Sequence, residues 1–153
     1  MKEKYGVLRI VLTAVALLMC VGCGAPSSFV RGSTGWKVIE VREGLNSDCD
    51  KAWQTTVDTV ARNWDIEMMD KESGYLRTAW TYGISGGVYN QYRGRLTVKF
   101  PGGQQCDKLE VRTEAQWLAD YYTGNWISGF DSAFNRDVYG ALSGRLGRTV
   151  PTE

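Results

Sequence analysis

Two segments of the chain alternate apolar and polar residues at every second position. They are residues 92–100 (YRGRLTVKF) and residues 108–117 (KLEVRTEAQW). This period predicts two neighbouring strands of an antiparallel sheet that has one buried and one solvated face. On the solvated face, Arg and Lys of the first strand should lie near Glu110 and Glu114 of the second. Such cross-strand ion pairs help to fix the register, and they explain these two carboxylates without a catalytic role.

Shorter patterns predict three further strands. These cover residues 36–41, 65–70 and 75–82, with turns over 71–74 and 101–103. Residues 118–129 contain several aromatic residues without a clear period, and they are expected to form a loop.

Two segments have the 3.6-residue period of amphipathic helices. In residues 47–64, apolar or small side chains recur at spacings of three and four, and Asn46 or Ser47 is the expected N-cap. The second helix follows Asp131 or Ser132, either of which can cap it, and ends near Gly147.

The order of these elements predicts one α+β domain, strand-helix-strand-strand-strand-strand-helix. Strands joined by short turns form a meander of about five antiparallel strands, and both helices should cover its one apolar face. Most of the tryptophans are expected on that buried face, namely Trp36, Trp53, Trp64, Trp80 and Trp117.

The first 22 residues have the pattern of a secretory signal peptide. Lys2, Lys4 and Arg9 precede an apolar run from Ile10 to Val21 that is too short to cross a bilayer as a helix. An uncleaved anchor helix is the less favoured alternative. Residues 24–35 are rich in turn-forming residues and are expected to be a flexible tether, which leaves residues 36–150 for the folded domain.

The end of this segment, Cys20-Val21-Gly22-Cys23, resembles a bacterial lipobox. The resemblance implies cleavage before Cys23, acylation of that residue and anchoring in a membrane. Gly24 follows instead of the Asp that favours retention in the inner membrane of enteric bacteria. The expected location is therefore the periplasmic face of the outer membrane.

The two remaining cysteines, Cys49 and Cys106, are expected to form a disulfide. Outside the cytoplasm thiols tend to be oxidised, and the alternating strand directions bring both residues to one end of the domain. A bridge closing such a loop should stabilise the fold by about 4 kcal/mol. Two unpaired buried thiols are the alternative.

The composition excludes several functions. The chain of 153 residues has 18 Lys and Arg against 17 Asp and Glu, and no His. The charge balance argues against a general nucleic-acid binder. Without His, the chain cannot build a Ser-His-Asp or Cys-His catalytic system or an imidazole metal site. No glycine-rich segment has the pattern of a phosphate-binding loop. We expect no catalytic residues, metal or cofactor.

Residues 50–80 resemble the repeating unit of the BamC (NlpB/DapX) lipoproteins. The likeness lies in Ala52-Trp53 on a helix, then Trp64-Asp65-Ile66, then residues 70–78 (DKESGYLRT). It implies a helix-grip fold, in which an antiparallel sheet holds a helix. It also implies an accessory role in outer-membrane β-barrel assembly.

Two functions remain open. The first is a non-enzymatic envelope lipoprotein that docks on a protein partner through the exposed sheet face or through aromatic loops. The candidate contact residues are Tyr89, Tyr121, Tyr122 and Trp126, which could instead form a small cluster under the last helix. The second is a binding module for a small apolar or glycan ligand. It requires a cavity between helix and sheet, bounded by Trp53, Leu96 and Val111.

Overall fold

The computed structural model describes residues 24–101 and 106–150, which form an α+β structure with two α-helices and one nine-stranded sheet, antiparallel at every pairing. The expected signal peptide and the acylated Cys23 lie outside these residues. The strands are β1 (Phe29–Arg31), β2 (Lys37–Val41), β3 (Ile66–Asp70), β4 (Tyr75–Thr78), β5 (Thr81–Tyr82), β6 (Tyr92–Lys99), β7 (Lys108–Asp120), β8 (Asn125–Asp131) and β9 (Gly147–Val150). The helices are α2 (Cys49–Ala61) and α3 (Ser132–Leu146), and a short 3₁₀ helix, η1, covers Ile84–Gly86.

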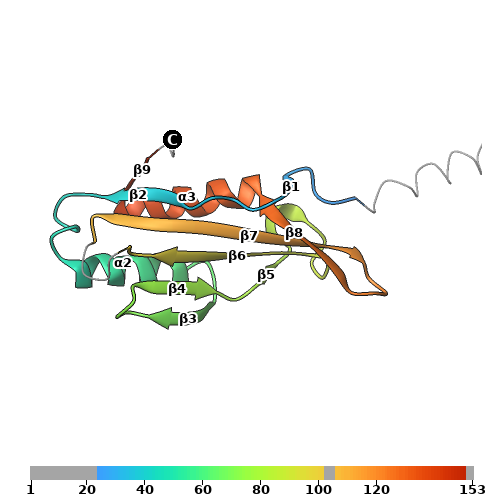
Figure 1. Cartoon of the computed structure of the whole chain (residues 1–153), viewed down its shortest axis with the longest axis horizontal. Helices are drawn as coiled ribbons and strands as arrows, with labels where there is room; N and C mark the ends of the chain where they lie inside the picture. The colour runs from blue at the N-terminus through green and yellow to red at the C-terminus, as the bar shows by residue number, and fades with distance from the viewer. Residues whose placement is uncertain (1–23, 102–105, 151–153) are drawn as a thin grey trace, which may run out of the picture.

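The long strand β7 organises the sheet (Figure 1). One of its edges pairs with β6 over eight residues, from Tyr92 opposite Trp117 to Lys99 opposite Glu110. Its other edge pairs with β2 near the start of β7 and with β8 near its end. Beyond these lie β9 and β1, while β4 and β3 extend the sheet past β6. The predicted meander is present, and it is larger than expected.

Both helices cover the same face of the sheet, behind the strands in Figure 1. The buried side chains of β6 and β7, such as Leu96 and Val111, belong to one core cluster with Trp53 of α2 and Leu142 of α3. The polar residues of both strands point the other way, as the period-two pattern predicts. We call the side of the sheet that faces away from the helices the outer face.

The disulfide prediction is confirmed. Cys49 in the first turn of α2 is bonded to Cys106 just before β7, and their Cα atoms are 5.3 Å apart. The N-cap of α2 differs from the prediction: it is Asp48, whose carboxylate accepts a hydrogen bond from the backbone N–H of Lys51 at 3.0 Å.

Four strands were not predicted, so the expected number of about five is wrong. Phe29–Arg31, expected in the tether, form β1 and pair with β8, so the sheet extends upstream of residue 36. Residues 125–131, expected mostly in a loop, form β8, whose Gly and Ser obscure the alternation of side chains. The predicted strand over 75–82 is divided into β4 and β5, and the chain after α3 continues directly into β9.

Some of the predicted burial is also wrong. Trp53 is buried, and Trp64 and Trp117 pack partly buried against the core, but Trp36 and Trp80 stack on cationic side chains of the outer face. On the edge strand β3 the register shifts between Ile66 and Met68, and Met68 is 48% exposed. An irregular edge strand does not keep the alternation that a central strand keeps.

Candidate interaction surface

Aromatic and cationic side chains alternate across the outer face. The guanidinium of Arg93, from β6, lies 3.9 Å from the ring centre of Trp126 and 4.6 Å from that of Trp80. The guanidinium of Arg95 also stacks on Trp80, 4.3 Å from the ring centre. Further along β6, the amine of Lys99 lies 4.7 Å from the ring of Trp36. We call these residues, with Tyr82, the stacked ladder.

Hydrogen bonds and ion pairs hold the cations of the stacked ladder in place. Arg93 donates to the side-chain oxygen of Gln116, at 2.6 and 3.0 Å, and to the hydroxyl of Tyr82 at 3.0 Å. Arg95 pairs with Glu114 at 2.6 Å and Lys99 with Glu110 at 2.9 Å, as predicted from the alternation. The aromatic rings are therefore presented on side chains whose geometry is already fixed. Such preorganised Trp, Tyr and Arg side chains are common at the energetic centres of protein interfaces.

The predicted aromatic contact residues do not form one patch. Trp126 lies in β8, not in a loop, and belongs to the stacked ladder. Tyr89 lies in a loop and packs on Tyr82, with 5.9 Å between ring centres, so it extends the ladder at its edge. Tyr121 and Tyr122 lie in the turn between β7 and β8 and contact each other. They belong to a separate surface at the end of the hairpin.

A cavity of about 340 Å³ lies at this end of the molecule. Its wall includes Gly24, Val88, Trp117, Leu118 and Tyr121, which come from the N-terminal segment, the loop after η1, and β7 with its turn. The cavity could not be predicted from the sequence, because the three segments are far apart along the chain.

A buried carboxylate joins the same parts of the fold. Asp131 has no exposed surface, and its oxygens accept hydrogen bonds from Ser28, Ser85, Tyr92 and the backbone N–H of Phe134 at 2.5 to 2.7 Å. Burial by itself would raise the pKa of Asp131. The N–H of Phe134 and the three hydroxyls outweigh burial and lower this pKa, so the group stays ionised.

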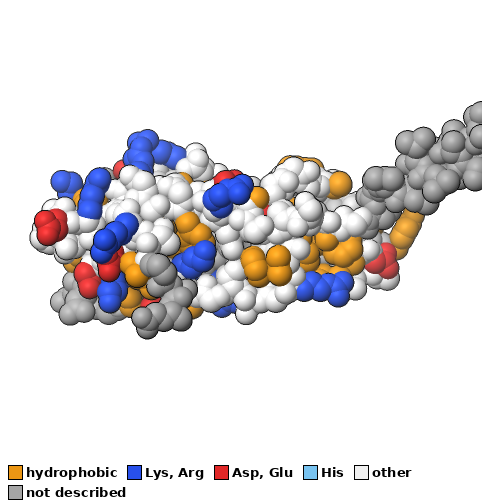
Figure 2. All heavy atoms as spheres, turned by 90° about the horizontal axis from the view of Figure 1, so that it is seen from above, with side chains coloured by type: hydrophobic (Ala, Val, Ile, Leu, Met, Phe, Trp, Pro, Cys, Tyr) orange, Lys and Arg blue, Asp and Glu red, His pale blue; other side chains and the backbone are white. Residues whose placement is uncertain are grey.

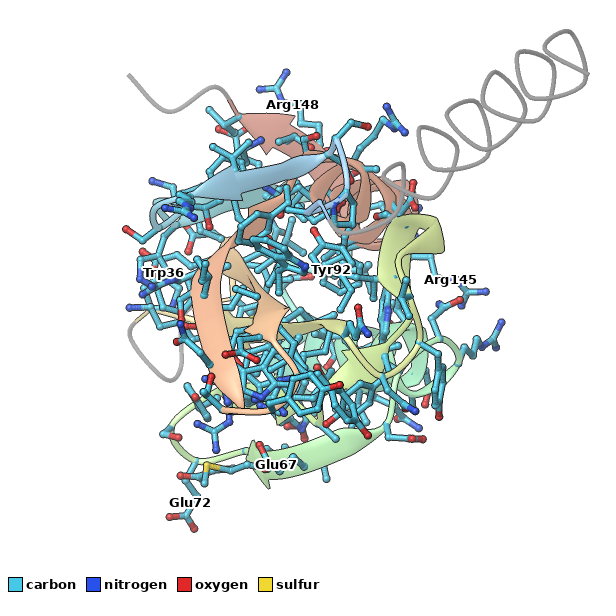
Figure 3. The ribbon with its side chains drawn as sticks, turned by 90° about the vertical axis from the view of Figure 1, so that its right-hand side faces the viewer. Trp36, Glu67, Glu72, Tyr92, Arg145 and Arg148 are labelled. Carbon is cyan, nitrogen blue, oxygen red and sulfur yellow. A yellow bond between two sulfur atoms is a disulfide. The ribbon has the colours of Figure 1, made fainter. Side chains whose placement is uncertain are left out.

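The arrangement around Asp131 is structural in character. The four donors occupy its oxygens, and Asp131, one of the two residues predicted as possible caps, caps α3. Burial, together with the hydrogen bond to Asp131, raises the pKa of Tyr92 well above its ordinary value, so its hydroxyl remains a donor. Figure 3 shows Tyr92 inside the fold and Trp36 on its outside. Ser28, Ser85 and Tyr92 were not predicted as partners of this residue.

The ligand cleft that the sequence left open gains no support from the described residues. Leu96 and Val111 are fully buried in the core cluster that includes Trp53. Of four cavities in the described part of the chain, two have Trp53 in their walls, but none has Leu96 or Val111. In the same part of the chain, no group of three or more His, Cys, Asp or Glu residues is placed to hold a metal ion. Among residues 24–101 and 106–150, no helix has both the length and the apolar character needed to cross a membrane.

The comparisons with known proteins give no relative. No model of a known protein family matches the chain, and no curated protein matches it in sequence.

Proposed function

We propose that this chain is a non-enzymatic envelope lipoprotein, anchored by acylated Cys23, that docks on a protein partner through the outer face of its sheet. The observation that carries this proposal is the stacked ladder. It places three tryptophans, two arginines and a lysine on a sheet face that the two helices leave free. Side chains of these types, held rigidly, lose little conformational entropy when a partner binds.

Two further features support an envelope location. The residues before Gly24 have the signal-peptide and lipobox pattern described above. The disulfide between Cys49 and Cys106 is of the kind that persists in oxidising compartments. The proposed location is the periplasmic face of the outer membrane.

We further propose an accessory or scaffold role in an outer-membrane assembly, with a helix-grip relationship to the BamC lipoproteins. Two observations agree with this part. The quoted motif lies on α2, β3 and β4 in the order that the resemblance implies, and α2 packs against the sheet. The resemblance supplies the class of partner, and the stacked ladder supplies the contact surface.

Cross-linking in intact cells, followed by purification of the acylated chain, tests the proposed docking. We expect a co-purified protein that is lost in the variants Trp126→Ala and Lys99→Glu, which alter the stacked ladder at two separate points. The matched control is Met69→Ser, because Met69 is 54% exposed on the edge strand β3, outside the ladder. An adduct that survives both ladder variants would show that the outer face is not the contact.

A further inference from the structure

Three uncharged segments meet at one end of the molecule. Residues 24–30, 83–92 and 121–130 contain no Lys, Arg, Asp or Glu, although 23% of the chain is charged. Gly24, Val88 and Tyr121 line one cavity, and the backbone N–H of Leu118 donates to the carbonyl of Gln91 at 2.8 Å. In Figure 1 the first described residues leave the domain on the side where the β7–β8 hairpin ends. We call this region the uncharged end.

The uncharged end exposes large apolar and aromatic side chains. Tyr122 is 98% exposed, Tyr89 69%, Tyr121 68% and Val88 59%. On the face seen in Figure 2, most charged side chains lie toward the left, while several orange side chains gather toward the right-hand end beside a few charged ones. Tyrosine, with an apolar ring and a polar hydroxyl, is enriched where hydrocarbon meets lipid headgroups.

The opposite end of the molecule is charged. It lies at the start of β7, about 40 Å from the hairpin turn if a strand advances 3.3 Å per residue. Its exposed residues include Arg42, Glu43, Asp107, Lys108 and Arg148. The two ends of the sheet therefore suit different surroundings.

The chain itself indicates what the uncharged end contacts. Gly24, in the wall of the cavity, directly follows Cys23, the proposed site of acylation. No spacer separates the lipid anchor from the cavity wall, so the uncharged end must lie close to the bilayer. Two or more acyl chains give stable attachment, and exposed apolar side chains beside them can then fix an orientation.

We propose that the uncharged end rests in the headgroup region of the bilayer that holds the anchor, with Tyr121 and Tyr122 inserted. This inference depends on the proposed acylation of Cys23. Charged residues border this end: Asp120 before the turn, buried Asp131 at the end of β8, and Arg31 opposite Gly129. The carboxylate of Asp120 accepts a hydrogen bond from the N–H of Tyr122 at 2.9 Å and so closes the turn. The orientation leaves the stacked ladder on the side of a domain that stands on the membrane, accessible to a protein partner.

Paramagnetic broadening of amide NMR signals tests the orientation. The full acylated chain is placed in nanodiscs of phosphatidylethanolamine and phosphatidylglycerol that contain a small fraction of gadolinium-chelating lipid. We expect loss of the amide peaks of residues 86–90 and 121–124, while the peaks of Lys108 and Arg148 persist. The pattern should be unchanged by added salt, because the proposed contact is made by tyrosine and apolar side chains and not by ion pairs with the headgroups.

The variant Tyr121→Ser/Tyr122→Ser should stay in the nanodiscs through its anchor and lose the selective broadening. The matched control, Met68→Ser/Met69→Ser, removes two exposed apolar side chains from β3 and should keep it. Intact hairpin peaks in the acylated wild type, or an unchanged pattern in the tyrosine variant, would overturn this inference alone. The inference would also be overturned if a partner protein covered the β7–β8 turn and the amide peaks of that turn were not broadened by the gadolinium lipid. A mature chain whose mass lacks acyl groups would overturn the anchor and this inference together.

Discussion

At the residue scale, Asp131 connects more of the fold than any other polar side chain described above. Its carboxylate holds the N-terminal segment through Ser28, the η1 turn through Ser85, and β6 through Tyr92, while it caps α3. Ser85 has a positive φ of 51°, which is uncommon for a residue other than glycine, and its bond to Asp131 helps to hold that conformation. Loss of the carboxylate should therefore loosen the uncharged end.

The lowered pKa of Asp131 makes a prediction about acid stability. Below the ordinary value of 3.8, the unfolded chain binds the proton more readily than the folded chain does. The stabilisation is therefore present above about pH 4 and is lost as the pH falls through the lower folded pKa. The free energy of unfolding, measured with urea across this pH range, should fall more steeply with decreasing pH in the wild type than in Asp131→Asn.

At neutral pH we expect Asp131→Asn to lower the free energy of unfolding by about 1–3 kcal/mol, because the substitution removes the charge and replaces one of the two acceptor oxygens by an NH₂ donor. Asp70 and Asp120 also have lowered pKa values, through hydrogen bonds within their turns, but both remain in the variant and so cancel from the comparison. Parallel stability curves for the two proteins would refute the role given to Asp131.

The cap of α3 could be predicted, whereas its hydrogen-bond partners could not. Polar residues directly before an amphipathic stretch limit the cap to Asp131 or Ser132 from local sequence alone. Ser28 is 103 residues away, Ser85 46 and Tyr92 39. Such partners become neighbours only through the strand order, which the sequence does not specify in enough detail.

Among the secondary-structure elements, the unpredicted strands β1, β8 and β9 extend the sheet around β7, and Gly129 of β8 tests the pairing of β8 with β1. A Cβ atom at Gly129 would lie 2.6 Å from the ring of Phe29 and would also overlap the carbonyl oxygen of Val30, both in β1. Gly129→Ala should therefore push β1 away and speed amide exchange in Phe29–Arg31.

Gly140 supplies the matched control. It is an exposed helical residue of α3, and a Cβ there would meet no atom within 4 Å. Gly140→Ala should stabilise the protein by roughly 0.5–1 kcal/mol, because alanine favours the helix. Unchanged exchange in β1 of Gly129→Ala would show that this strand is not held against β8.

The disulfide between Cys49 and Cys106 should stabilise the fold. The paired variant Cys49→Ser/Cys106→Ser should lose about 4 kcal/mol of unfolding free energy, since a cross-link over a separation of 57 residues restricts the unfolded chain. Denaturant titration measures the loss, and wild type treated with a thiol reductant should match the variant. A loss below about 1 kcal/mol would show that the bridge adds little.

Some strands could be predicted from the alternation of apolar and polar residues, and others could not. β6 and β7 are long, central and half-buried, so their alternation is complete. β1 has three residues, β8 contains Ser128 and Gly129, and β9 follows a helix without an intervening loop. These strands are fixed by pairing with distant chain segments and carry little periodic signal of their own.

As a whole, the domain has three surfaces: a face covered by helices, an outer face with the stacked ladder, and the uncharged end. The last two adjoin at Trp126 and Tyr89. The absence of charge in three segments is visible in the sequence, but only the topology brings them together. The predicted burial of Trp36 and Trp80 is wrong because their cationic partners come from β6, another part of the chain. Stacking on Lys99, Arg93 and Arg95 satisfies these rings on a solvated face.

The proposed function depends on contact between the outer face and a protein partner. Site-specific photo-cross-linking in cells can detect this contact, with p-benzoylphenylalanine in place of Trp126 on the outer face or of Met69 on β3. We predict a discrete adduct with one envelope protein from position 126 and none from position 69. Adducts from position 69 with none from position 126 would contradict the account.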